Sequence, residues 1–187
     1  ANTATSFGNP SLGLWAKTAN SDNASNVTLR TPSMMLMREG PNSTFGIKGS
    51  AANRKTGIST ETNVLTIRNN ATFAGVTNRI QVRIDILSSS CSTDCTIRLV
   101  TNPTIGGTPS FTDFDTNTSA ISIDTAGTTR TGGRVVMSFV LDGNNGQVVD
   151  FVGRELFLYP GDTLAVTASS VTGALAANVG VSWLEEN

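Results

Sequence analysis

The 187-residue sequence contains no histidine, and only 14% of its residues are charged and 6% aromatic. Histidine is the side chain that enzymes use most often as a general base, and it is the commonest protein ligand of metals. Its absence also rules out the usual serine-centred catalytic triad. The composition therefore predicts a protein that binds and assembles and is not an enzyme, and we expect no metal and no cofactor.

Long apolar runs are missing, as is an excess of either charge. No stretch approaches the ~20 apolar residues of a transmembrane helix, and no basic-then-apolar signal peptide opens the sequence. The 13 lysines and arginines nearly balance the 14 aspartates and glutamates, so the formal net charge is −1. We therefore expect partners that are neither nucleic acid nor membrane.

Thr, Ser, Asn and Gly are abundant and surround short stretches in which apolar and polar residues alternate. The clearest stretch covers residues 79–86, which we predict to be a half-buried antiparallel strand. Its apolar residues are expected to share one face: Ile80, Val82, Ile84 and Ile86. Residues 96–100 are expected to pair with this strand across a turn at 88–95.

Turn signals separate the predicted strands. A strand over residues 133–142 is expected to form a hairpin with residues 147–152 through Asn145-Gly146, and Pro160-Gly161 is typical of a β-turn. With about 8–10 strands and no long helical pattern, the predicted fold class is all-β, an antiparallel β-sandwich or jelly roll. We expect this domain to cover residues 27–187, with an extended N-terminal arm at 1–26.

The two cysteines, Cys91 and Cys95, lie at the end of the predicted 79–86 strand. A zinc site would need two further ligands, which a chain without histidine or other cysteines lacks. Three residues separate the cysteines, and no helix is predicted beside them, which does not fit a redox site. A disulfide that closes the turn is the favoured interpretation, with two free thiols as the alternative; a disulfide would indicate an oxidising setting.

Three groups of residues are candidates for an assembly interface, and each also has an interpretation within its own domain. An apolar cluster on the arm could bind a neighbouring subunit or pack along its own domain. A methionine-rich strand could lie in an interface or in the core, and a charged cluster near residue 150 could form ion pairs between or within subunits. The candidates are Leu12, Leu14 and Trp15; Met34, Met35 and Met37; and Arg154 and Glu155.

Two further features have a structural and a chemical interpretation. Trp183 lies on an alternating strand with Val179 and Val181 and is expected in the core. Asp113 and Asp115 would project from the same side of a strand. Paired carboxylates serve glycoside hydrolysis, and oxygen ligands at alternate positions suit calcium, but we expect a solvated face.

Three segments of the C-terminal third together resemble small β-sandwich structural proteins of tailed bacteriophage virions. They are residues 131–139, residues 156–168 with their Pro-Gly-Asp turn into Thr-x-x-Val-Thr, and residues 179–186 with Val-x-Val-x-Trp. The resemblance implies a jelly-roll-like virion component, often trimeric, and no catalytic residues.

These observations lead to one expected function and one main alternative. The expected function is that of a capsid cement or decoration protein. It would bind the outer surface of the virion across neighbouring copies of the major capsid protein, as a homotrimer assembled in the host cytoplasm. The main alternative is a receptor- or glycan-binding module of a tail or fibre, with Tyr159 or Trp15 as its exposed aromatic platform. A capsid, neck or tail-tube subunit, a hydrolase and a non-viral adhesin are further alternatives.

Overall fold

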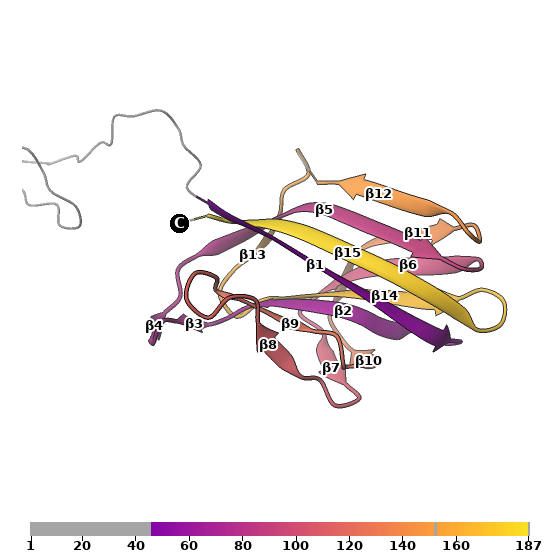
Figure 1. Ribbon diagram of the computed structural model, residues 1–187, viewed down its shortest axis with the longest axis horizontal. Helices are drawn as coiled ribbons and strands as arrows, with labels where there is room; N and C mark the ends of the chain where they lie inside the picture. Colours follow the sequence, from indigo (N-terminus) through magenta and orange to yellow (C-terminus); the bar gives the residue numbers. More distant parts are fainter. Residues whose placement is uncertain (1–45, 152, 187) are drawn as a thin grey trace, which may run out of the picture. The chain divides into compact units, whose positions relative to one another are not determined.

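The computed structural model describes residues 46–151 and 153–186, and these residues form fifteen strands and no helix (Figure 1). The expected arm and the boundary at residue 26 lie outside the described residues. The strands are β1 Gly46–Ile58, β2 Thr62–Asn69, β3 Thr72–Phe73, β4 Val76–Thr77, β5 Gln81–Cys91, β6 Cys95–Thr101, β7 Thr104–Gly106, β8 Phe111–Asp113, β9 Ile121–Asp124, β10 Thr129–Thr131, β11 Arg134–Leu141, β12 Gly146–Asp150, β13 Leu156–Leu158, β14 Thr163–Ser170 and β15 Leu175–Glu186.

Two antiparallel sheets carry the fold, as the sequence predicted. One has the order β1-β15-β5-β12, with β13 also paired to β5, and the other has the order β11-β6-β14-β2-β9-β8. β1 pairs with β15, β2 with β14, β5 with β12 and β13, and β6 with β11. The chain therefore resembles one long hairpin wrapped over two sheets, which is the topology of a jelly roll.

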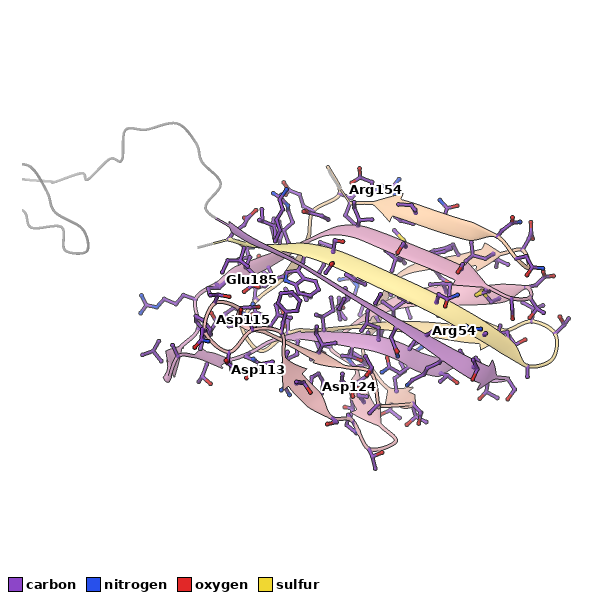
Figure 2. All side chains as sticks on the ribbon, in the orientation of Figure 1. Arg54, Asp113, Asp115, Asp124, Arg154 and Glu185 are labelled. Carbon is purple, nitrogen blue, oxygen red and sulfur yellow. A yellow bond between two sulfur atoms is a disulfide. The ribbon has the colours of Figure 1, made fainter. Side chains whose placement is uncertain are left out.

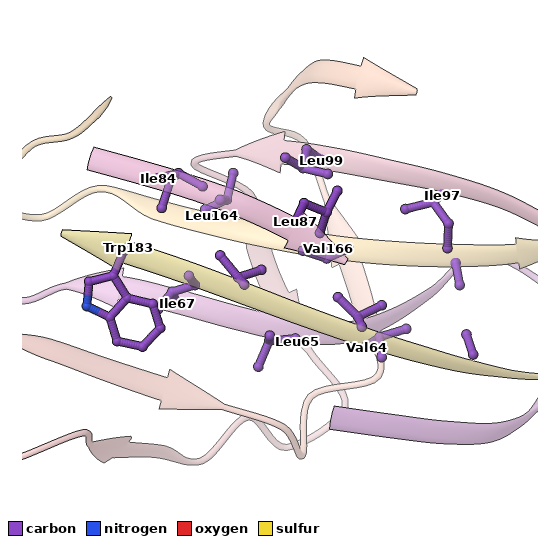
Figure 3. Packing of buried hydrophobic residues seen from close by; sticks show 14 of the residues in the cluster. Val64, Leu65, Ile67, Ile84, Leu87, Ile97, Leu99, Leu164, Val166 and Trp183 are labelled. Carbon is purple, nitrogen blue, oxygen red and sulfur yellow. The ribbon is translucent and has the colours of Figure 1, made fainter. Parts of the chain in front are cut away.

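The hydrophobic core lies between the two sheets (Figure 3). Buried and less buried residues largely alternate along β5, β6 and β15, as strand geometry predicts. Residues 63–67 of β2 and 164–168 of β14 are instead all buried. Trp183 is 1% exposed, which confirms its predicted place in the core. The labelled core residues are Val64, Leu65, Ile67, Ile84, Leu87, Ile97, Leu99, Leu164, Val166 and Trp183.

A β-bulge in β5 changes which of its side chains face the core. Ser182 lies opposite Ile86 and Trp183 lies opposite Ile84, so Asp85 has no partner residue in β15. The extra residue reverses the alternation. Val82 and Ile84 are buried as predicted, whereas the prediction for Ile86 was wrong: it turns outward, 40% exposed, and Leu87 takes the inward position.

Both predicted hairpins are instead crossings between the two sheets. β5 and β6 do not pair, because β5 belongs to the sheet of β15 and β6 to the sheet of β14. Likewise, β11 pairs with β6 and β12 pairs with β5. A short turn holds two strands close together, but it does not require them to share a sheet.

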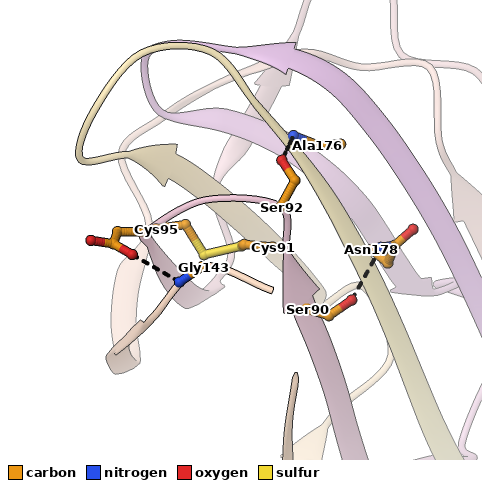
Figure 4. Close-up of a disulfide and its surroundings, with 8 residues drawn as sticks. Ser90, Cys91, Ser92, Cys95, Gly143, Ala176 and Asn178 are labelled. Carbon is orange, nitrogen blue, oxygen red and sulfur yellow. Dashed lines mark hydrogen bonds between the residues drawn. A yellow bond between two sulfur atoms is a disulfide. The ribbon is translucent and has the colours of Figure 1, made fainter. Parts of the chain in front are cut away.

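Cys91 and Cys95 form a disulfide at the first of these crossings (Figure 4). Both cysteines are buried, and the turn between them holds two other connections in place. The Asp94 carboxylate accepts a hydrogen bond from the Gly143 amide at 2.8 Å, and Ser92 Oγ accepts one from the Ala176 amide at 2.9 Å. The Val171 amide also donates to the Asp94 carbonyl at 3.1 Å, so the turn holds the β11–β12 connection, the β14–β15 connection and the start of β15 at this end of the sandwich.

A buried carboxylate holds the β8–β9 connection against β15. Glu185 is 1% exposed and accepts hydrogen bonds from Ser119 Oγ at 2.6 Å, the Ala120 amide at 2.8 Å and Trp183 Nε1 at 3.3 Å. Phe114, from the same connection, packs edge-on against Trp183, with ring centroids 5.1 Å apart. These donors satisfy the carboxylate, as a buried charge requires.

Candidate assembly surface

β11 and β12 are the outermost strands of their sheets and lie on the same side of the sandwich (Figure 1). Residues 142–145 connect them, so the two edges come from one continuous piece of chain. No described strand pairs with the outer side of either one. We call this surface, made of β11, β12 and Arg154, the open edge.

Exposed valines are concentrated on the open edge. Val135, Val136 and Val140 of β11 are 44%, 39% and 65% exposed, and Val148 of β12 is 63% exposed. The residues 134–141 and 146–150 contain no lysine and no proline, the residues with which edge strands usually prevent pairing. Exposed apolar side chains gathered on one edge are typical of a surface that contacts a partner.

An apolar cleft of about 300 Å³ lies along the open edge between the two strands. Its lining residues are Met137, Phe139, Val140, Gln147, Val149 and Arg154. Met137, Phe139 and Val149 are half-buried and pack against the core, so part of the cleft is lined by residues at the margin of the hydrophobic core. Met, aromatic residues and Arg are enriched at the centres of protein interfaces.

The opposite side of the sandwich is closed by side chains that cross between the sheets. On β1, Asn53 Nδ2 donates to the Val64 carbonyl at 2.7 Å, and Lys55 Nζ donates to the Asn63 carbonyl at 2.8 Å and to the Gly127 carbonyl. Burial lowers the pKa of Lys55, although the charge of Asp124 opposes this change. Polar side chains of β1 therefore bridge the two sheets on this side of the sandwich.

The structure places Arg154 at the cleft (Figure 2). Glu155, the next residue in the chain, is also exposed and does not line the cleft. The described ion pairs do not include Arg154; they join Arg83 to Asp85 and Glu186, and Glu61 to Arg98 and Arg130. The hydrogen bond that Arg83 donates to Asp85, with smaller contributions from the charges of Asp85, Glu186 and Glu155, raises the pKa of Arg83. The other candidates lie outside the described residues: Leu12, Leu14, Trp15, Met34, Met35 and Met37.

Asp113 and Asp115 are both exposed, but they have different partners. Asp113 accepts a hydrogen bond from Asn70 Nδ2 at 3.3 Å. Asp115 accepts hydrogen bonds from the amides of Asn117 and Thr118, and these bonds lower its pKa. Within the described part of the chain, no group of three or more acidic or cysteine side chains is placed to hold a metal ion.

No pattern in the sequence indicated which residues close the β1 side. Asn53 and Lys55 belong to an ordinary polar stretch, and their role depends on the neighbouring sheet. Glu185 could have been identified, because it continues the inward alternation of Val179, Val181 and Trp183. A carboxylate at an inward position predicts a satisfied buried charge.

The fold and this surface define a class of protein: an all-β jelly-roll domain with one side closed by polar side chains and one apolar side left open. No protein-family model matches the chain, and no curated protein matches it significantly. Among residues 46–151 and 153–186, no helix is long and apolar enough to cross a membrane.

Proposed function

We propose that this chain is a non-enzymatic structural protein of a bacteriophage virion, of the capsid cement or decoration type. It stabilises the head by binding across capsid subunits as a homotrimer. The observation that carries this proposal is the jelly roll with an apolar edge that no described strand covers. The resemblance of the C-terminal third to virion proteins supports the same function.

The occupant that we propose for the open edge is a second copy of the chain. β11 offers a row of main-chain groups without a described partner, flanked by exposed valines, and Arg154 provides an exposed cation at the cleft. In a cyclic trimer each open edge would meet a different surface of the next subunit, so the contact closes on itself. Closure leaves no apolar edge exposed.

The N-terminal residues would then contact the capsid. In this proposal, Leu12, Leu14 and Trp15 and the segment with Met34, Met35 and Met37 bind neighbouring copies of the major capsid protein. Three such arms on one trimer bind together, so that weak single contacts give strong attachment. The near-neutral net charge suits an outer surface of the virion better than contact with packaged DNA.

Native mass spectrometry with two matched variants tests the self-assembly. Val140→Lys places a charge on the open edge, and Val171→Lys places one on the β14–β15 connection, where the valine is similarly exposed at 58%. We expect a trimer for the unchanged protein and for Val171→Lys, and a monomer for Val140→Lys. A monomeric unchanged protein, or a trimeric Val140→Lys variant, would show that the open edge does not hold copies together.

A second experiment tests the virion role separately. Peptide mass spectrometry is applied to purified phage particles. The particles come from the phage whose genome encodes this chain, or from the host that carries that genome. We expect the chain in a fixed ratio to the major capsid protein and expect deletion of residues 1–25 to release it from the particles. Its absence from purified particles would overturn the virion role without affecting the trimer, and retention after deletion would overturn the role of the arm.

A further inference from the structure

A polar cleft of about 500 Å³ lies away from the open edge, on the other half of the six-stranded sheet. Three segments form it: the end of β2 with the residues that follow, the end of β8, and the turn before β14. Its lining residues are Arg68, Asn70, Ala71, Thr72, Asp113 and Gly161. From this cleft we infer that the protein carries a binding site for a neutral sugar ring, of the hexose type.

Arg68 is held rigidly at this site by groups on both of its sides. Its Nε donates to Asn70 Oδ1 and to Ser122 Oγ, both at 3.2 Å, and Cζ lies 3.9 Å from the centre of the Phe111 ring. Ser122 Oγ in turn donates to Asn70 Oδ1 at 2.8 Å. The guanidinium plane is therefore fixed before a ligand arrives, and such preorganisation lowers the entropic cost of binding.

The two terminal nitrogens of Arg68 remain available to a ligand. No described residue accepts a hydrogen bond from Nη1 or Nη2, although Nε is satisfied twice. Two parallel donors in a fixed fork match two neighbouring oxygen atoms. Adjacent hydroxyls of a sugar ring present such a pair.

Asp113 supplies acceptors in the same cleft and determines the charge of the ligand. Its Oδ1 accepts from Asn70 Nδ2, and Oδ2 has no hydrogen-bond donor among the described residues. A carboxylate in the cleft offsets the positive charge of Arg68 and repels an anion. A ligand that both donates and accepts hydrogen bonds without net charge fits this pair, which favours a neutral sugar over a phosphate or an acidic sugar.

Buried asparagines fix the walls of the cleft. Asn69 and Asn78 are buried, and Asn78 Nδ2 donates to Asn69 Oδ1 and to the Asn70 carbonyl, both at 2.7 Å. The Gly161 amide donates to the Asn69 carbonyl at 2.8 Å, which ties the turn before β14 to the end of β2. Tyr159 begins that turn and is 58% exposed.

Saturation-transfer NMR on the full chain tests this site, with glucose, galactose, mannose and N-acetylglucosamine as neutral probes and N-acetylneuraminic acid and inorganic phosphate as anionic ones. An open cleft that holds one sugar ring predicts a Kd of about 1 mM or weaker. We expect a saturable signal from at least one neutral sugar. The inference of a sugar site does not depend on the proposed virion role, so the result of this experiment leaves that role untouched.

Matched variants show whether the sugar binds in this cleft. Arg68→Met and Asp113→Ala should each weaken binding about 10- to 100-fold, whereas Arg54→Met, which removes an exposed arginine from β1, should leave it unchanged. Arg68→Lys keeps the charge without the fork and should also weaken binding, which covers the case in which Arg68→Met does not fold.

Three outcomes would overturn the inference. In the first, no neutral sugar gives a saturable signal. In the second, only the anionic probes bind, and they do so more tightly in Asp113→Ala. In the third, a sugar binds equally well to the folded Arg68→Lys variant, which would place its site elsewhere.

Discussion

Gly49 of β1 lies directly opposite Trp183 of β15, and the indole ring occupies the space that a side chain at position 49 would need. A Cβ atom built on Gly49 would lie 2.5 Å from Cε2 and Cζ2 of the indole. Real Cβ atoms do not approach other atoms so closely, and the indole is held by its hydrogen bond to Glu185 and by Phe114. The glycine is therefore part of the packing of the tryptophan.

The first prediction concerns this contact. Gly49→Ala should lower the free energy of unfolding by about 1–3 kcal/mol, because the added methyl overpacks a filled site. Gly146→Ala is the matched control, since a Cβ there would have ordinary contacts at 3.5 Å or more. Urea unfolding followed by circular dichroism measures both, and equal stability of the two variants would contradict the prediction.

The second prediction concerns the buried carboxylate of Glu185. Glu185→Gln keeps the shape but places an amide NH₂ against groups that donate hydrogen bonds, so we expect a loss of about 2–3 kcal/mol of unfolding free energy. Hydrogen exchange at the Ala120 amide should also become faster, because its acceptor is weakened. Glu186→Gln, which breaks a partly exposed ion pair with Arg83, should cost less than about 1 kcal/mol.

The third prediction is a pH dependence that arises from Glu61. Burial alone would raise its pKa, but hydrogen bonds from Thr167 and Arg130 and the charges of Arg130 and Arg98 outweigh burial and lower the pKa. A carboxyl with a lowered folded-state pKa stabilises the fold above its unfolded-state pKa, and this stabilisation is lost as the pH falls through the folded-state pKa.

Glu61→Gln should therefore cost about 1 kcal/mol at pH 7 and progressively less below the ordinary glutamate range. The measurement is the difference in unfolding free energy between the unchanged protein and the variant across that pH range. A difference that stayed constant at low pH would show that the charge of Glu61 contributes nothing.

The fourth prediction concerns the disulfide. Replacing both Cys91 and Cys95 with alanine should cost about 2 kcal/mol, the loop-closure entropy of so short a loop. Because the Cys91–Cys95 turn also holds Gly143 and Ala176, hydrogen exchange at those two amides should increase. A reducing agent should lower the Tm of the unchanged protein and leave that of the double variant unaltered; an equal effect on both would contradict the prediction.

Part of the fold and of the open edge could be predicted from the sequence. Alternation placed Val179, Val181 and Trp183 in the core, because a strand turns successive side chains to opposite faces. The Pro160-Gly161 turn was also predicted correctly: Gly161 has a φ of +94°, and the Asp162 amide donates to the Tyr159 carbonyl. The valines of residues 134–141 are visible in the sequence, but nothing local shows that their strand lies at an edge.

The sequence by itself determined the all-β class and most inward-facing residues, because backbone alternation and turn chemistry are local. Only the tertiary structure decided the partners of each strand. The connections at Cys91–Cys95 and Asn145-Gly146 cross between sheets, and the bulge at Asp85 depends on β15. The tertiary structure also decided that polar side chains close the β1 side while the outer sides of β11 and β12 remain without a described partner strand. Hydrogen bonds between strands join residues far apart in the chain, so their pattern depends on which surfaces the whole chain can bury together.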